Sequence, residues 1–292
     1  MTMICHYYAT LRCNDTCEFC RLWQMTESQQ INEASIADIA PKLRAARIKG
    51  AGSLNVTGGE PLLRDDLAEI LKEGKKLGFT TELTTNGLLY KEKGRLLGGL
   101  VDRLFISLDY PIAAEHDRSR GVECYQDVLS AIRYAVEIGE RPIINFTMTR
   151  DSVRYLPEMV ELAGKLQVRL QLNPVYDHFG AQGFEKATLA HIRYYAKRRN
   201  VLVDLAALAF IEAGGNRVMF PRCRAGQTTI TILPDGSLVK PCFYNPGGRQ
   251  GREDVCSSCM RWPYMLPSFS RGLDKYRWLN WYSEVLKRRK LS

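Results

Sequence analysis

The sequence lacks any run of about 18 consecutive apolar residues, the length that a membrane-spanning helix needs. Residues 1–6 include neither a basic region nor an apolar region, so they are not a secretory signal. Internal repeats and low-complexity segments are also missing. The composition, 45% hydrophobic and 25% charged, is that of an ordinary globular protein. We therefore expect a cytoplasmic protein that does not enter a membrane.

Cysteine is abundant, with 9 residues in a chain of 292. A disulfide framework belongs to small secreted domains, whereas clustered cysteines in a cytosolic chain more often bind metal. Seven of the nine form two clusters, which are Cys13, Cys17 and Cys20 near one end and Cys223, Cys242, Cys256 and Cys259 near the other. The distribution predicts two metal sites.

Six short β-like runs alternate with helical patterns up to about residue 200, at roughly 25 to 30 residues per unit. They lie at 4–11, 53–57, 80–85, 103–108, 142–148 and 169–172. This spacing predicts parallel βαβ connections, as in a partial (β/α)6 TIM-like barrel or in a doubly wound sheet. Polar residues at every second position, such as Thr80, Glu82 and Thr84, favour a barrel with a polar interior.

The pattern changes after residue 205, so we expect a barrel domain over 1–205 and a small domain over 206–292. Pro234-Asp235-Gly236 between two β-prone runs predicts a hairpin over 228–240. An amphipathic helix is expected from about residue 273 to 290. Its basic end, 287–290, has two interpretations. We favour a solvated helix terminus whose basic side chains oppose the macrodipole over a surface that binds an anionic partner.

The first cluster has the spacing C-x3-C-x2-C and directly follows the first β-like run. Three thiolates on one loop suit a soft metal centre, but structural zinc normally takes a fourth ligand. A [4Fe–4S] cluster held by Cys13, Cys17 and Cys20 would leave one iron open for another molecule. The loop also falls at the C-terminal end of a strand, where barrel enzymes have their active sites.

This cysteine pattern resembles the signature of the radical S-adenosylmethionine (SAM) superfamily, and the resemblance spans roughly residues 4 to 180. It implies that SAM binds the open iron and is cleaved to a 5′-deoxyadenosyl radical, which abstracts hydrogen from a substrate. Further motifs at successive strand ends resemble those of the family. They are Thr57-Gly58-Gly59-Glu60-Pro61, Thr84-Thr85-Asn86-Gly87 and Ser107-Leu108-Asp109.

The resemblance implies a role for each of these residues in binding SAM. Gly58 and Gly59 permit close approach of the backbone, and Glu60 would receive the methionine ammonium group. Oxygens of Thr85, Asn86, Ser107 and Asp109 would meet the ribose and the carboxylate, and Arg150 could pair with that carboxylate. Phe19 and Asn173 would lie beside the adenine.

The second cluster resembles the start of a Twitch or SPASM domain, which carries auxiliary iron–sulfur clusters in this superfamily. Its four cysteines satisfy either a fully ligated auxiliary [4Fe–4S] cluster, which we favour, or a Zn(Cys)4 site. An auxiliary cluster could accept an electron in the oxidation of a small molecule, and a general base would then remove a proton. Candidate bases are Glu82 and Asp177, although Glu82 also fits a hydrogen-bonding residue of the barrel wall.

We expect a small-molecule substrate more than a peptide, because only twelve residues precede Cys13 and leave no room for a peptide-recognition domain. An electron donor such as flavodoxin or ferredoxin is implied. Modification of a peptide or protein remains open. From another class, a zinc-stapled nucleic-acid-binding protein is also possible, but basic and aromatic residues are interleaved only near 278–290.

Overall fold

The computed structural model describes residues 3–20, 22–24, 32–175, 184–217, 223–239, 259 and 261–291. Within this part of the chain the strands form a single sheet in the order β7-β6-β5-β4-β3-β2-β1-β8-β9. The strands are β1 (Met3–Thr10), β2 (Ala51–Gly58), β3 (Thr80–Thr85), β4 (Arg103–Ser107), β5 (Ile143–Met148), β6 (Arg169–Pro174), β7 (Val201–Val203), β8 (Thr229–Ile232) and β9 (Leu238–Val239). Every pairing is parallel except the hairpin of β8 and β9.

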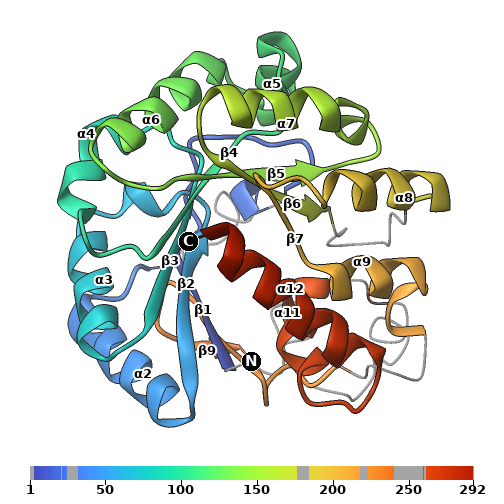
Figure 1. The fold of residues 1–292 in the computed structure, drawn as a ribbon. Helices are drawn as coiled ribbons and strands as arrows, with labels where there is room; N and C mark the ends of the chain where they lie inside the picture. Colours follow the sequence, from blue (N-terminus) through green and yellow to red (C-terminus); the bar gives the residue numbers. More distant parts are fainter. Residues whose placement is uncertain are drawn as a thin grey trace.

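The helices lie around this curved sheet, most of them on its outside and the two C-terminal ones across its open inner side (Figure 1). They are α2 (Ile36–Ile48), α3 (Leu67–Lys76), α4 (Tyr90–Lys93), α5 (Ala113–Arg120), α6 (Tyr125–Glu137), α7 (Leu156–Lys165), α8 (Lys186–Tyr195), α9 (Leu205–Glu212), α11 (Trp262–Phe269) and α12 (Lys275–Leu291). Four 3-10 helices connect them: η1 (Pro61–Leu63), η2 (Gly94–Leu97), η3 (Ser152–Tyr155) and η4 (Gly215–Arg217). The TIM-barrel-like α/β fold expected from the sequence is confirmed.

The six expected strands are all present, and the sheet is wider than those six. β7 adds a parallel strand beside β6, and β8 joins the other edge by pairing with β1. The sequence did not indicate β7 because it is three residues long, and pairing between residues 4–7 and 229–232 is too remote for a local pattern to reveal. The division into domains at 205/206 stays a prediction.

The alternating polar residues face the barrel interior, as the sequence pattern predicts. In β3 Thr81, Leu83 and Thr85 are buried, whereas Glu82 and its neighbours on the other face are half-buried and line an internal cavity. Register then brings polar groups together: Glu82 is opposite Asn55 of β2 and Arg103 of β4.

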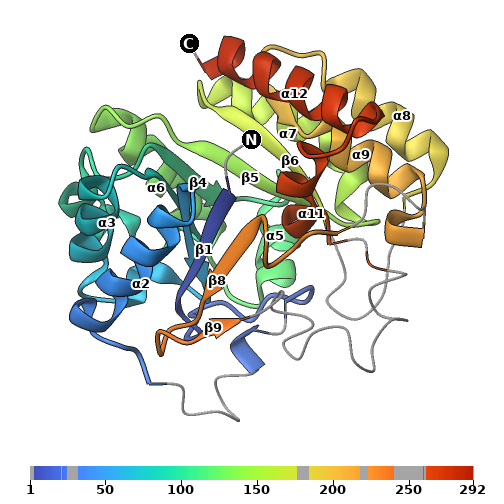
Figure 2. The same cartoon turned by 90° about the horizontal axis from the view of Figure 1, so that it is seen from below.

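The C-terminal helix α12 packs against the barrel near the N-terminal ends of β6 and β7, away from the loop that follows β1 (Figure 2). The preceding helix α11 contacts the other end of β6, where Trp262 meets Pro174. Lys290 donates to the carbonyls of Ala196 at 2.8 Å and Val201 at 2.7 Å. Lys287 pairs with the buried Asp204 at 2.9 Å. α12 is therefore part of the barrel wall. In the part of the chain that the structure describes, no helix has the length and apolar character to cross a membrane.

Candidate active site

The cysteine loop, residues 11–20, follows β1 and is held from two sides. The backbone N–H groups of Gly59 and Glu60 donate to the carbonyls of Thr10 and Arg12, both at 2.8 Å. On the other side the N–H of Thr16 donates to the carbonyl of Arg120 at 2.9 Å. The C-terminal end of α5, which has unused carbonyl groups like any helix end, thus anchors the loop.

Gly58 and Gly59 are needed for contact with this loop. A Cβ at Gly59 would lie 2.0 Å from the carbonyl oxygen of Arg12, and one at Gly58 would lie 2.2 Å from that of Thr10. Gly58 also has φ +132°, which only glycine adopts readily. The close backbone approach expected here is made to the protein's own cysteine loop, a role that the motif alone did not reveal.

Glu60 is 1% exposed and accepts three hydrogen bonds. Its donors are the N–H of Leu62 at 2.9 Å, the Thr85 hydroxyl at 2.7 Å and the N–H of Asn86 at 2.7 Å. Burial nevertheless raises the pKa of this carboxyl to about 7. A cation beside Glu60, such as an ammonium group, would restore the charged form.

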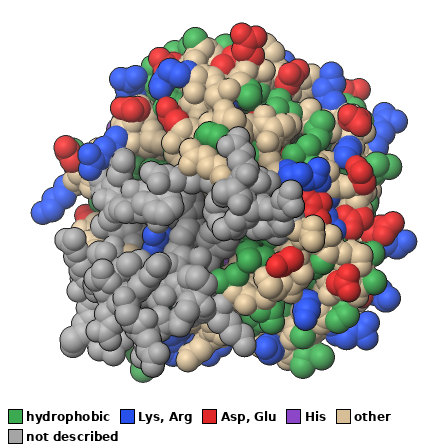
Figure 3. Space-filling model, turned by 180° about the vertical axis from the view of Figure 1, so that it is seen from behind, with side chains coloured by type: hydrophobic (Ala, Val, Ile, Leu, Met, Phe, Trp, Pro, Cys, Tyr) green, Lys and Arg blue, Asp and Glu red, His purple; other side chains and the backbone are tan. Residues whose placement is uncertain are grey.

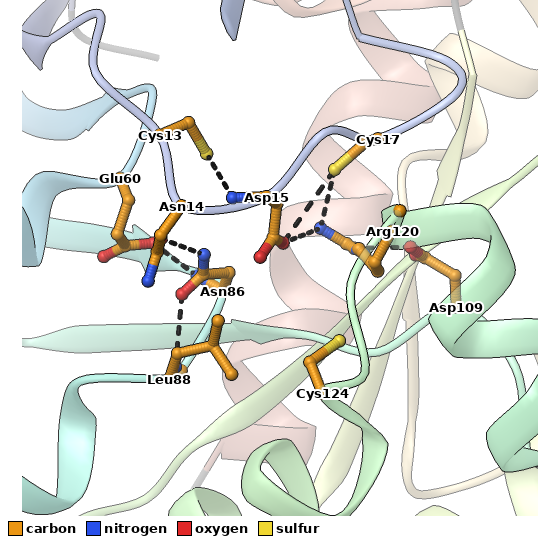
Figure 4. Close-up of polar contacts among 12 residues, drawn as sticks. Cys13, Asn14, Asp15, Cys17, Glu60, Asn86, Leu88, Asp109, Arg120 and Cys124 are labelled. Atoms are coloured by element: carbon orange, nitrogen blue, oxygen red, sulfur yellow. Dashed lines mark hydrogen bonds and ion pairs between the residues drawn. The ribbon is translucent and has the colours of Figure 1, made fainter.

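Arg120 connects the loop to the barrel, as Figure 4 shows. It is 6% exposed and forms ion pairs with Asp109 and, at 3.7 Å, with Asp15. Its Nη1 also lies 3.7 Å from the sulfur of Cys17. Asp109 in turn accepts from the N–H of Thr147 at 2.8 Å, so protein groups bind both of its oxygens.

The aromatic residue of the cysteine motif also contacts Arg120. The Arg120 guanidinium lies 5.5 Å from the centre of the Phe19 ring, a cation–π distance. Beside it Asn86 donates to the side-chain oxygen of Asn14 at 2.8 Å. The loop, strand β3 and helix α5 therefore share one polar network (Figure 4).

The three thiols of this loop fit an iron–sulfur cluster. Burial raises the pKa of Cys13 and of Cys17 to about 12 and raises that of Cys20, so their thiolates need a metal to form. Among the described residues no three His, Cys, Asp or Glu side chains are arranged to hold a single metal ion. Three cysteines on one clamped loop suit a cluster, in which each thiolate binds a different iron.

The other residues expected to bind SAM, and the two candidate general bases, are spread over several strands and loops. Ser107 is buried at the end of β4, Arg150 is exposed just after β5, and Asn173 of β6 bonds to Asn145 inside the barrel. Glu82 pairs with Arg103 at 2.8 Å and accepts from Asn55 at 3.4 Å, which agrees with a hydrogen-bonding role in the wall. Asp177 lies outside the described residues.

Two of the four C-terminal cysteines are described, and Cys242 and Cys256 lie outside the described residues. Cys223 and Cys259 are half-buried, and each sulfur accepts a backbone N–H two residues later, from Ala225 at 3.4 Å and from Arg261 at 3.5 Å. The Arg261 guanidinium also lies 3.8 Å from the Cys259 sulfur. In both clusters, then, a largely buried arginine faces a cysteine sulfur.

A cavity of about 790 Å³ lies inside the barrel. Much of its wall consists of uncharged polar side chains: Ser53, Asn55, Thr84, Asn145, Gln171 and Asn173. α11 contributes Trp262, whose indole N–H donates to the carbonyl of Pro174 at 3.0 Å. The volume is in the range of sites for small molecules.

The cavity lies directly behind the strand ends. Phe105 and Asn145 line it, and the next residues on the same faces of β4 and β5 are Ser107 and Thr147. Two residues of a strand span about 7 Å, so a molecule in the cavity lies one layer below the predicted SAM contacts.

Arg120 and Asp15 complete the network around Cys17 and were not predicted from the sequence. Gly121, with φ +72°, ends α5 and could have marked Arg120 as the last residue of a helix. Nothing in the local pattern, however, indicates that this helix end contacts the cysteine loop.

A partial parallel barrel with three cysteines on the loop after its first strand defines a class of SAM-dependent barrel enzyme. A family model described as the radical SAM superfamily matches residues 7–163. The chain therefore belongs to the radical SAM superfamily and is an enzyme.

Curated relatives and solved structures agree with this family. A probable GTP 3′,8-cyclase of Methanopyrus kandleri is 36% identical over 84% of this chain and 82% of its own length. One from Saccharolobus solfataricus is 33% identical over 80% of each chain. In fold, the chain is similar to Streptococcus suis SuiB bound to precursor peptide SuiA, with TM-score 0.68, 22% identity and coverage of 85% of this chain. It spans 61% of the SuiB chain. AnSMEcpe with bound AdoMet and Kp18Cys peptide gives TM-score 0.61 at 15% identity, over 91% of this chain and 79% of that one.

Proposed function

We propose that this enzyme abstracts a hydrogen atom from a small polar molecule held in the barrel cavity. The observation that carries the proposal is the cavity of about 790 Å³, which is rich in uncharged hydrogen-bonding side chains and reaches to one layer below the strand ends. Relatives named as probable GTP 3′,8-cyclases make a nucleotide the first candidate class of substrate.

Residues at the strand ends would hold the cofactors. Cys13, Cys17 and Cys20 would bind the [4Fe–4S] cluster, and the bound cluster with SAM supplies the radical that takes the hydrogen. The raised pKa of Glu60 supports its role as the partner of the methionine ammonium group. The other proposed SAM contacts are Phe19, Gly58, Gly59, Thr85, Asn86, Ser107, Asp109, Arg150 and Asn173.

The C-terminal cysteines Cys223, Cys242, Cys256 and Cys259 would hold a second [4Fe–4S] cluster. The contact between Arg261 and the Cys259 sulfur supports this, because a guanidinium stabilises thiolate charge. A flavodoxin or ferredoxin would supply electrons, and an auxiliary cluster could accept one in a net oxidation. Zinc at this site remains the competing interpretation.

A peptide substrate is the second candidate, since the solved structures with a similar fold include proteins bound to peptides. We favour the small molecule because α11 and α12 form part of the cavity wall. For a nucleic-acid-binding protein the surface gives little support: over the described residues seen in Figure 3, basic and acidic side chains are interspersed.

The test is anaerobic purification followed by incubation with SAM and dithionite. We expect brown protein with about eight irons, and 5′-deoxyadenosine that disappears in Cys13→Ala. Deuterium transfer from labelled candidates, with GTP tested first, would identify the substrate. Colourless protein that contains only zinc would rule the proposal out.

A further inference from the structure

Most charged groups of the cavity wall form ion pairs with one another. Arg103 pairs with Glu82 at 2.8 Å. Lys287 pairs with Asp204 at 2.9 Å and with Glu284 at 3.5 Å. Lys287 is one cation for two carboxylates, so these five groups carry a net charge of −1 and do not attract an anion.

Arg277 of α12 differs from these residues. It lines the cavity, is exposed, and its guanidinium forms no ion pair with any residue that the structure describes. Glu284 is seven residues further along the helix, or about 10 Å, and Lys287 holds it there. An exposed cation at the wall of a cavity is therefore available to a ligand.

Trp281 lies four residues after Arg277 and thus on the same face of α12. Its side chain lines the cavity although it is 60% exposed, which places it at the opening. Trp278 packs edge-on against it, with ring centres 6.4 Å apart. The helix itself is fixed to the barrel, because the N–H of Leu205 donates to the Ser283 hydroxyl at 3.0 Å.

We propose that Arg277 and Trp281 form an entrance site that binds the anionic end of the substrate. A guanidinium forms paired, charge-assisted hydrogen bonds with a phosphate or carboxylate, and an indole packs on a planar group. The interior penalises entry of the anion, because a buried charge needs a partner and the cations of the cavity wall are already paired with carboxylates. The substrate would thus bind with its anionic part and a planar group at α12, and with the rest of its neutral polar part inside.

This inference rests on the proposed function, because it takes the cavity to be the substrate site. A phosphate and a carboxylate could both bind the guanidinium, so each is tested with its own probe: tripolyphosphate carries phosphates and citrate carries carboxylates. The full-length protein, reconstituted with iron and sulfide, is titrated by calorimetry with tripolyphosphate, with citrate, and with GTP and guanosine.

We expect Arg277→Gln to weaken binding of the preferred anion at least about ten-fold, the range for a hydrogen bond to a charged group. Arg271→Gln is the matched control, since Arg271 is exposed near the start of α12 and does not line the cavity. Trp281→Ala should weaken GTP binding several-fold and leave tripolyphosphate binding unchanged.

The inference is overturned if neither anion binds the wild-type protein, or if Arg271→Gln and Arg277→Gln weaken binding equally. A Trp281→Ala variant that binds GTP as wild type does would overturn the role of the indole. Failure of the proposed function would appear separately, as absence of 5′-deoxyadenosine with every small molecule. It would not change the affinities that these titrations measure.

Discussion

Arg120 places its guanidinium between Asp109, with which it pairs, and the sulfur of Cys17, 3.7 Å from Nη1. Asp15 completes the group at 3.7 Å, and all of these side chains are buried. One guanidinium therefore contacts two carboxylates and a cysteine sulfur, and it links α5 to the cysteine loop.

We expect Arg120→Gln to lower the free energy of unfolding by about 3–5 kcal/mol, because it leaves buried carboxylates without a cation. Chemical denaturation of the metal-free protein measures this without any cluster. Arg118→Gln is the matched control: Arg118 pairs with Glu18 and Glu115 on the surface, where such pairs contribute about 1 kcal/mol or less. Equal losses for both variants would contradict the central role of Arg120.

Gly59→Ala should displace the cysteine loop, because the new Cβ would lie 2.0 Å from the carbonyl oxygen of Arg12. We expect a loss of about 1–3 kcal/mol in stability and a clear fall in bound iron. Gly164→Ala in α7 provides the control, since only the Asn200 amide, at 3.9 Å, approaches that position. That change should raise stability by about 0.5–1 kcal/mol. Normal iron content in Gly59→Ala would refute the proposed contact.

The barrel and its polar interior could be predicted from the sequence, because hydrophobic period and strand parity are local signals. Thr80, Glu82 and Thr84 showed which face of β3 looks inward, and the cavity lies there. The three-cysteine loop was likewise visible as a spacing.

The contacts between distant segments could not be predicted in this way. Arg120 meets Cys17 across 103 residues, and β8 meets β1 across more than 220. Asp109, a proposed SAM contact, also accepts from Arg120 and Thr147, and neither of these partners was expected from the sequence. A motif indicates which residues gather at a strand end, but packing decides which of them bind one another.

His116 of α5 should make stability depend on pH. It is fully buried, and burial, reinforced by Arg120, lowers its pKa to about 4. The unfolded chain therefore binds a proton between pH 6.5 and 4 that the folded chain does not, so this residue makes stability fall as pH falls through that window.

The expected readout is the unfolding free energy of the wild type minus that of His116→Gln. It should increase by up to about 3 kcal/mol as pH rises from 4 to 6.5. Glu60, with its raised pKa, gives the opposite slope, but both proteins contain it and it cancels. His191→Gln, on the exposed side of α8, is the matched control for the loss of an imidazole at the surface. A pH-independent difference for His116→Gln would refute the prediction.

Glu82→Gln tests whether this carboxylate is a general base or part of the barrel wall. Because Glu82 already binds Arg103 and Asn55, we expect kcat to fall less than about ten-fold while KM rises. A general base would typically lose about 100-fold or more. Arg103→Gln should give a similar pattern, since it breaks the same pair; a large loss of kcat confined to Glu82→Gln would instead assign proton transfer to this residue.

Cys259→Ala separates the two metal sites. If the four C-terminal cysteines hold a [4Fe–4S] cluster, bound iron should fall from about eight to about four atoms per chain. SAM cleavage should persist in this variant, because the open iron belongs to the loop of Cys13. Cys124→Ala is the control: Cys124 is buried at the start of α6, so its replacement affects packing and leaves iron content unchanged. An unchanged iron content in Cys259→Ala, with one zinc lost, would assign the C-terminal site to zinc and remove the auxiliary cluster from the proposed oxidation.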